Sequence, residues 1–92
     1  MSALQFLHVV HQAIILLKDN NASEANKHID LAEQLLDDIP PDESGRDELL
    51  ILNTMIRGYW NKVPSIDISD IESQYLKAFM QHISHAQKKS GI

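Results

Sequence analysis

Apolar residues recur at helical spacing along four stretches of the chain, separated by polar or proline-containing turns. In the first stretch, residues 3–18, a helical arrangement places nine apolar side chains on one half of the circumference. Leu4 and Ile15 fall on the other half, among polar residues such as His8 and His11. A surface helix of a single domain needs an apolar stripe only about 100° wide. We therefore expect this helix to be covered on more than one side, by the other helices and by a second chain.

Three further helices are predicted, over about residues 23–39, 47–62 and 67–89. Pro40 and Pro64 end the second and third helices, because proline cannot continue the intrahelical hydrogen bonds. Ser44 is placed to cap the third helix, and Ser69 with Glu72 matches a capping box for the fourth. The core stripe predicted for the fourth helix consists of Ile68, Ile71, Tyr75, Phe79, Ile83 and Ala86. No stretch alternates apolar and polar residues for long enough to predict a strand. The sequence therefore predicts one all-α domain, residues 1–92, built as a small four-helix bundle of antiparallel hairpins.

Some apolar residues fall outside the main stripes of their own helices. Leu50 and Ile51 do so in the third helix, as Leu4 and Ile15 do in the first. Apolar side chains left over from a core are candidates for an interaction surface. We expect these four residues to contact a partner protein.

The third predicted helix also contains the only tryptophan of the chain and an internal glycine. Trp60, beside Tyr59, would anchor an interface if it were exposed, although core packing is the more common fate in a small bundle. Gly58 costs roughly 1 kcal/mol relative to alanine within a helix. That cost indicates either the close approach of another backbone or a helix that frays early.

Small and bulky residues in the first two predicted helices follow a distinctive spacing. The pattern consists of Ala13, Leu16, Ala25, Ile29 and Ala32. It resembles one helical hairpin of the tetratricopeptide-repeat family over residues 9–40. The chain departs from the family pattern at Val9, Asn20 and Pro40, where the family has a tryptophan, a turn glycine and an earlier proline. The resemblance implies a repeat-like fold with a surface that binds a peptide or another partner, and no enzyme activity.

Charge is unevenly distributed along this chain of net charge −5. Residues 21–48 contain nine acidic residues against Lys27 and Arg46. No basic stripe is present that could displace counterions from a phosphate backbone, so we expect no direct nucleic-acid partner. The acidic region is either a solvated loop and helix face or a docking surface for a basic protein. The candidates for that docking surface are Asp37, Asp38, Asp42 and Glu43.

The chain contains no cysteine, which excludes thiolate metal sites, and two pairs of histidines are the candidates for a zinc site. His8 and His11 are three residues apart, as are His82 and His85. Convergence of the two pairs would be needed to complete a zinc site. Neither pair has a nearby acid in helical register to orient the imidazole rings, so solvated or boundary histidines are the simpler interpretation. His82 lies at the edge of an apolar stripe and is expected to be partly buried. We predict neither a cofactor nor a catalytic site.

These patterns favour a small acidic helical module that binds another protein, as an adaptor, chaperone or inhibitor that occludes its partner. We also expect a homodimer. A cytoplasmic location is expected, because no secretory signal is recognisable and no run reaches the roughly 18 apolar residues of a membrane span. One alternative is an acidic protein that mimics nucleic acid and inhibits a DNA- or RNA-binding protein. A histidine-based metal-dependent enzyme is the alternative from another class.

Overall fold

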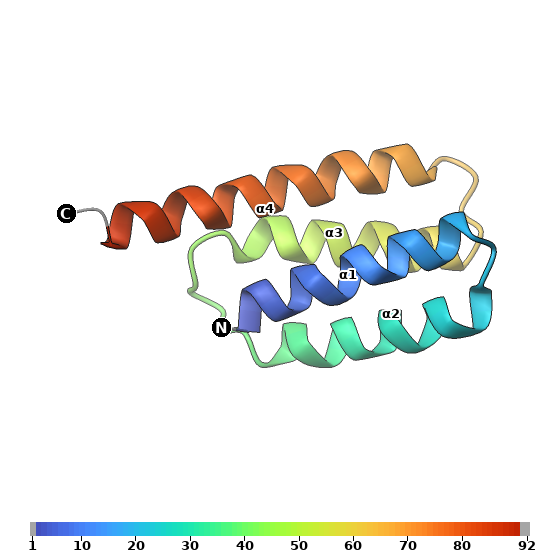
Figure 1. The fold of residues 1–92 in the computed structure, drawn as a ribbon, viewed down its shortest axis with the longest axis horizontal. Coiled ribbons are helices and arrows are strands. Elements are labelled where there is room, and N and C mark those ends of the chain that lie inside the picture. The colour runs from blue at the N-terminus through green and yellow to red at the C-terminus, as the bar shows by residue number, and fades with distance from the viewer. Residues whose placement is uncertain (1, 91–92) are drawn as a thin grey trace.

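The chain folds into a bundle of four helices connected by short turns (Figure 1). The computed structural model describes the backbone of residues 2–90 and the side chains of residues 3–83. Its helices are α1 (Ser2–Lys18), α2 (Ala22–Asp37), α3 (Arg46–Trp60) and α4 (Ile68–Ser90). Consecutive helices run in opposite directions, and no strand occurs in the described part of the chain. The predicted all-α bundle of antiparallel hairpins is confirmed.

α1 occupies a central place in this arrangement. In Figure 1 it runs in front of α3, with α4 on one side of it and α2 on the other. α1 packs most extensively on α2 and also contacts α4 and α3, while α3 packs on α4 and α2. One face of the molecule is therefore formed by α2, α1 and α4 together, and α3 lies on the opposite face.

The core is one cluster of apolar side chains from all four helices and the α2–α3 connection. Its largest fully buried members are Phe6, Leu7, Val10, Ile29, Ile39, Leu49, Leu52, Ile56 and Ile71. Three alanines at the contact of α1 with α2, Ala13, Ala25 and Ala32, are completely buried. Small side chains at such positions allow two helix backbones to approach closely. The spacing that resembles a repeat hairpin thus lies at a closely packed helix pair.

The start of α3 differs from the expected one. Gly45, rather than Ser44, occupies the capping position, with φ of 85° and no side-chain cap. The left-handed conformation favours glycine, and a Cβ at this position would lie 3.0 Å from Nε2 of His82. Arg46 closes the same loop by donating from Nε to the carbonyl of Ile39 at 3.0 Å. The predicted Ser44 cap is wrong, because the capping position is one residue later. There the backbone is left-handed and lies close to the ring of His82, which favours glycine.

The start of α4 is capped by two aspartates. The Asp67 carboxylate accepts hydrogen bonds from the Asp70 backbone N–H at 3.1 Å and from the Ser69 hydroxyl at 2.6 Å. In return, the Asp70 carboxylate accepts from the Asp67 backbone N–H at 3.3 Å. This reciprocal pattern is a capping box placed two residues earlier than the predicted pair of Ser69 and Glu72. Glu72 is instead free to bind Lys18 of α1, which it does at 2.9 Å.

α4 is rotated relative to its predicted stripe. Ile71, Ala78 and His82 are buried, whereas Phe79 and Ile83 are each 36 % exposed. Residues spaced by four drift about 40° around a helix at every step, because a turn contains 3.6 residues. The expected stripe of every fourth residue therefore turns out of the core toward the C-terminal end. Its last predicted member, Ala86, lies outside the described side chains.

A left-handed residue lies two positions after the end of both α1 and α3: Asn20 with φ of 60° and Lys62 with φ of 65°. After each of them, the next backbone N–H donates to the carbonyl five residues upstream, at 2.8 Å and 3.0 Å. This is the Schellman arrangement, in which glycine is the usual left-handed residue. Lysine there is less favourable than glycine, because its Cβ crowds the backbone in this conformation.

We expect Gly45→Ala to lower the free energy of unfolding by about 1–3 kcal/mol, through backbone strain and contact with His82. Urea denaturation followed by circular dichroism measures the change. Ser44→Ala is the matched control and should change stability little, since Ser44 caps no helix. An unchanged urea midpoint for Gly45→Ala would contradict this account of the loop.

Candidate functional site

An exposed stripe runs along the outer side of α1. It consists of Leu4, His8, His11 and Ile15, which are spaced by four, three and four residues and so lie on one side of the helix. Leu4 is 42 % exposed and Ile15 is 41 % exposed. The structure thus places both sequence-predicted residues of α1 on one surface, pointing away from the core.

α4 supplies a second stripe with the same spacing, formed by Glu72, Leu76, Phe79 and Ile83. The ion pair of Glu72 with Lys18 fixes this stripe beside α1. Leu76 is 57 % exposed and lines a hollow together with Ile15. The two helices therefore present their outer stripes side by side.

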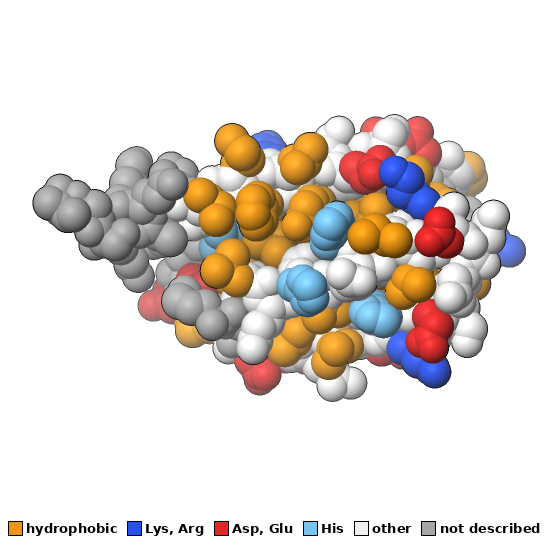
Figure 2. All heavy atoms as spheres, in the orientation of Figure 1, with side chains coloured by type: hydrophobic (Ala, Val, Ile, Leu, Met, Phe, Trp, Pro, Cys, Tyr) orange, Lys and Arg blue, Asp and Glu red, His pale blue; other side chains and the backbone are white. Residues whose placement is uncertain are grey.

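α2 supplies a third stripe on the other flank of α1, with the same spacing again: Glu24, His28, Leu31 and Leu35. Leu31 is exposed, and Leu31 and Leu35 line a hollow with Leu4. We name the surface formed by the three stripes the α1 face. Its exposed apolar residues are Leu4, Ile15, Leu31, Leu76, Phe79 and Ile83. Figure 2 shows this side of the molecule, with apolar and histidine side chains gathered over α1 and its neighbours.

Two hollows flank α1 on this face. The one between α1 and α2 has a volume of about 490 Å³ and the one between α1 and α4 about 220 Å³. His11 stacks on Tyr75 with ring centroids 5.2 Å apart, and Tyr75 stacks on Phe79 at 6.0 Å. Burial raises the pKa of Tyr75, so its phenol stays neutral well above neutral pH. The stacked rings of His11 and Tyr75 both line the second hollow.

Charged side chains border the α1 face at one end. Among the described residues of the three helices, ion pairs join Lys18 to Glu72 and Lys27 to Glu24, close to the α1–α2 turn. Away from that turn the stripes carry histidine and apolar side chains only, up to Ile83. A partner could therefore cover most of the face without desolvating an acid or a lysine, which would be costly.

The other two predicted interface residues lie elsewhere. Leu50 and Ile51 of α3 are exposed, as expected of residues outside the main stripe. α3 directs Leu49, Leu52 and Ile56 into the core that it shares with α1. Leu50 and Ile51 consequently point away from α1, and the structure does not bring them to the α1 face.

The acidic region is divided between structure and surface. Arg57 of α3 reaches across to α2 and donates to Glu33 at 2.6 Å and 3.0 Å and to Asp30 at 2.7 Å. The hydrogen bonds from Arg57 hold the pKa of Glu33 below its ordinary value. These two acids thus fasten α2 to α3. The predicted docking residues lie farther along: Asp37, Asp38 and Asp42 are exposed, and Glu43 is half-buried.

The histidines that could have formed a metal site occupy different environments. His8 and His11 lie on the α1 face, while His82 is buried, with Nε2 against Gly45. The expectation that His82 is partly buried is confirmed. His85 lies outside the described side chains. Within residues 3–83, no three histidine or carboxylate groups are close enough together to hold a metal ion.

The internal glycine of α3 makes room for a side chain rather than for another backbone. A Cβ on Gly58 would lie 2.6 Å from Cδ1 of Ile66, which folds back from the α3–α4 connection. The expectation of a close backbone approach is therefore wrong. α3 continues to Trp60, two residues beyond the glycine.

Sequence reasoning missed the contributions of α2 and α4 to the α1 face. Leu31 and Leu76 were not singled out, and Phe79 and Ile83 were assigned to the core. A usable signal was present, because all three helices repeat the spacing of four, three and four residues at their outer positions. What the spacing does not show is which helices become neighbours.

No family model matches this chain, and no curated protein and no solved structure shows significant similarity to it. The resemblance of residues 9–40 to a tetratricopeptide-repeat hairpin therefore rests on residue spacing alone. None of the described helices is both long and apolar enough to cross a lipid bilayer.

Glu33→Gln is expected to reduce the loss of stability on acidification. The pKa of Glu33 is lowered by Arg57 in the folded state, so its stabilising contribution is complete above the unfolded pKa. It is lost as the pH falls through the folded pKa. Because the carboxylate is partly solvated, we expect a contribution below about 1 kcal/mol.

Urea denaturation at pH 7 and at about pH 3 measures this difference. Glu43→Gln, remote from the Arg57 pair, is the matched control. The wild type and Glu43→Gln should lose more stability between the two pH values than Glu33→Gln. Equal losses in all three proteins would contradict the role given to the Arg57 pair.

Proposed function

We propose that this protein acts by binding another protein through the α1 face, as an adaptor, chaperone or inhibitor. The observation that carries the proposal is the set of three adjoining stripes, on α2, α1 and α4. Their exposed members are apolar or histidine over most of the length of the bundle. Contiguous exposed apolar surface on a small protein is typical of an interaction site.

The shape of the α1 face supports a helical partner. Its two hollows lie on either side of α1, so a helix docked along α1 could insert apolar side chains into both. Amphipathic helices commonly bind in this way, through anchors spaced by three and four residues. Apolar burial of this kind contributes about 25 cal/mol for each Å² removed from water.

The exposed acids give the proposed partner a second property. Asp37 is the last residue of α2, and Asp38 and Asp42 follow it, outside the apolar part of the face. Charges at the margin of an interface act mainly on the rate of encounter and on its salt dependence. A partner with a basic area beside its apolar contact surface fits this distribution.

We expect Ile15→Glu to abolish partner binding, because it places a charge in the hollow that Ile15 lines together with Leu76. Ile51→Glu on α3 is the matched control and should bind normally. Affinity capture from the native cell, quantified by mass spectrometry, identifies proteins retained by the wild type and by Ile51→Glu but lost with Ile15→Glu. Circular dichroism checks that both variants fold.

The alternative function, in which the protein is an acidic mimic of nucleic acid, predicts the opposite result. Neutralising Asp37, Asp38, Asp42 and Glu43 would then abolish capture, and Ile15→Glu would leave it intact. That outcome, or equal capture by Ile15→Glu and the wild type, would overturn the proposal.

Self-association through the α1 face is a separate expectation. We propose a homodimer in which the face of one copy covers that of another. Sedimentation of the wild type from low to high micromolar concentration should then show a shift to twice the monomer mass, and Ile15→Glu should remain a monomer. A wild-type monomer at every concentration would contradict the dimer and leave the face to a different protein.

A further inference from the structure

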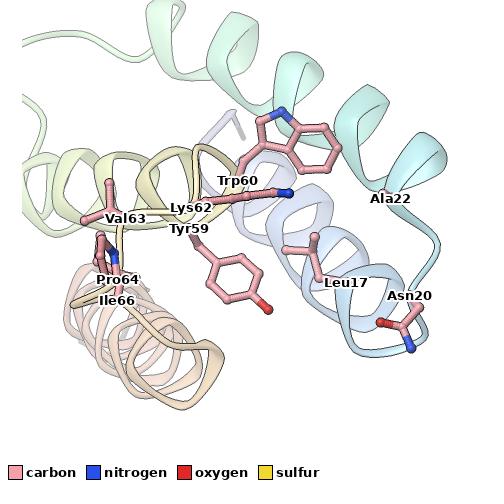
Figure 3. Close-up of a pocket in the computed structure, with 9 residues that line it drawn as sticks. All are labelled: Leu17, Asn20, Ala22, Tyr59, Trp60, Lys62, Val63, Pro64 and Ile66. Atoms are coloured by element: carbon pink, nitrogen blue, oxygen red, sulfur yellow. The ribbon is translucent and has the colours of Figure 1, made fainter.

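A cleft separate from the two hollows of the α1 face lies at the end of the bundle where the α1–α2 turn meets the α3–α4 connection (Figure 3). Its volume of about 670 Å³ is within the range usual for small-molecule sites. Leu17 and Asn20 line it from the end of α1, Ala22 from the start of α2, and Tyr59 and Trp60 from the end of α3. The remaining lining residues are Lys62, Val63, Pro64 and Ile66. It shares none of these with the hollows of the α1 face.

Local backbone geometry opens this cleft. The left-handed residues Asn20 and Lys62 turn the chain sharply at the ends of α1 and α3. Gly58 then leaves room for Ile66 to fold back onto α3 and form one wall. The cleft is thus lined by the ends of α1 and α3, the start of α2, and the α3–α4 connection folded back onto α3.

The lining of the cleft combines apolar surface with a single charge. Leu17, Val63 and Ile66 supply aliphatic walls, and the rings of Tyr59 and Trp60 supply aromatic ones. Figure 3 shows Lys62 extended between these two rings, with its ammonium directed toward Leu17. None of the nine lining residues is acidic, although the chain as a whole has a net charge of −5.

This charge pattern selects the class of ligand. Lys62 is exposed at the surface of the cleft, beside its apolar walls. A cation in such a place attracts an anion whose remaining atoms are themselves apolar. An ammonium group pairs well with a carboxylate, and such charge-assisted hydrogen bonds are stronger than neutral ones. The Tyr59 hydroxyl and the Asn20 amide are further donors among the lining side chains.

We propose that this cleft binds a small organic carboxylate carrying an apolar chain or ring, with Lys62 pairing with the carboxylate. The backbone at Lys62 adds an independent argument. Lysine adopts a left-handed conformation there, with φ of 65°, where glycine would be less strained. Strained residues of this kind tend to occur where function requires the side chain.

Trp60 provides a direct readout, because it is the only tryptophan of the chain and lines the cleft. Titration of the full-length protein with sodium octanoate should change its tryptophan fluorescence and saturate. Octylammonium, which has the same chain and the opposite charge, should bind at least about tenfold more weakly, a difference typical of one charge-assisted pair. Saturation by both ligands at equal concentrations would show that Lys62 does not select a carboxylate and would overturn the proposal.

Substitution of Lys62 tests its role in the same assay. Lys62→Met keeps the length of the side chain and removes its charge, so octanoate binding should weaken about tenfold or more. Lys77→Met is the matched control, since Lys77 is exposed on α4 and does not line the cleft. Unchanged octanoate binding by Lys62→Met, or the absence of any saturable fluorescence change in the wild type, would refute the assignment.

A second variant separates ligand binding from folding. Lys62→Gly relieves the left-handed backbone and should raise the urea midpoint, while still weakening octanoate binding. The urea midpoint should thus rise while the affinity for octanoate falls. A folded Lys62→Gly protein that binds octanoate as the wild type does would overturn the proposal, whatever the behaviour of Lys62→Met.

Discussion

α1 contacts each of the other three helices, and the wide arc of apolar residues along it holds the bundle together. Phe6, Leu7 and Val10 are fully buried at the centre of the molecule, and Ala13 allows α2 to pack closely. Since the three other described helices pack on the inner arc, none of the described helices covers the outer stripe of Leu4 and Ile15. The exposed face is thus a direct consequence of how the core is filled.

Polar contacts fix the positions of the helices around this core. Arg57 joins α3 to two acids of α2, and Lys18 joins α1 to Glu72 of α4. Partly exposed ion pairs of this kind contribute only modestly to stability, and here they link neighbouring helices. The Arg57 pairs therefore make Asp30 and Glu33 part of the scaffold, while Asp37, Asp38 and Asp42 remain exposed.

The four helices, their approximate ends and the exposure of Leu4, Ile15, Leu50 and Ile51 could be predicted, because each follows from periodicity within one helix. The cap at Gly45 could not, since it depends on a distant ring, that of His82. The rotation of α4 was missed because a step of four residues drifts around the helix, and Ala78 gave no strong signal. The composition of the α1 face depends on which helices become neighbours, which is a property of the tertiary structure.

The matching outer stripes on α2, α1 and α4 have a geometric consequence. A helix docked along α1 would complete a five-helix array in which α1 is the enclosed axis and no longer a surface element. Helices that are hydrophobic almost all around are found in such interior positions. In that assembly residues 3–17 would have the composition expected of an ordinary buried helix. The isolated bundle would then lack the one helix that encloses α1.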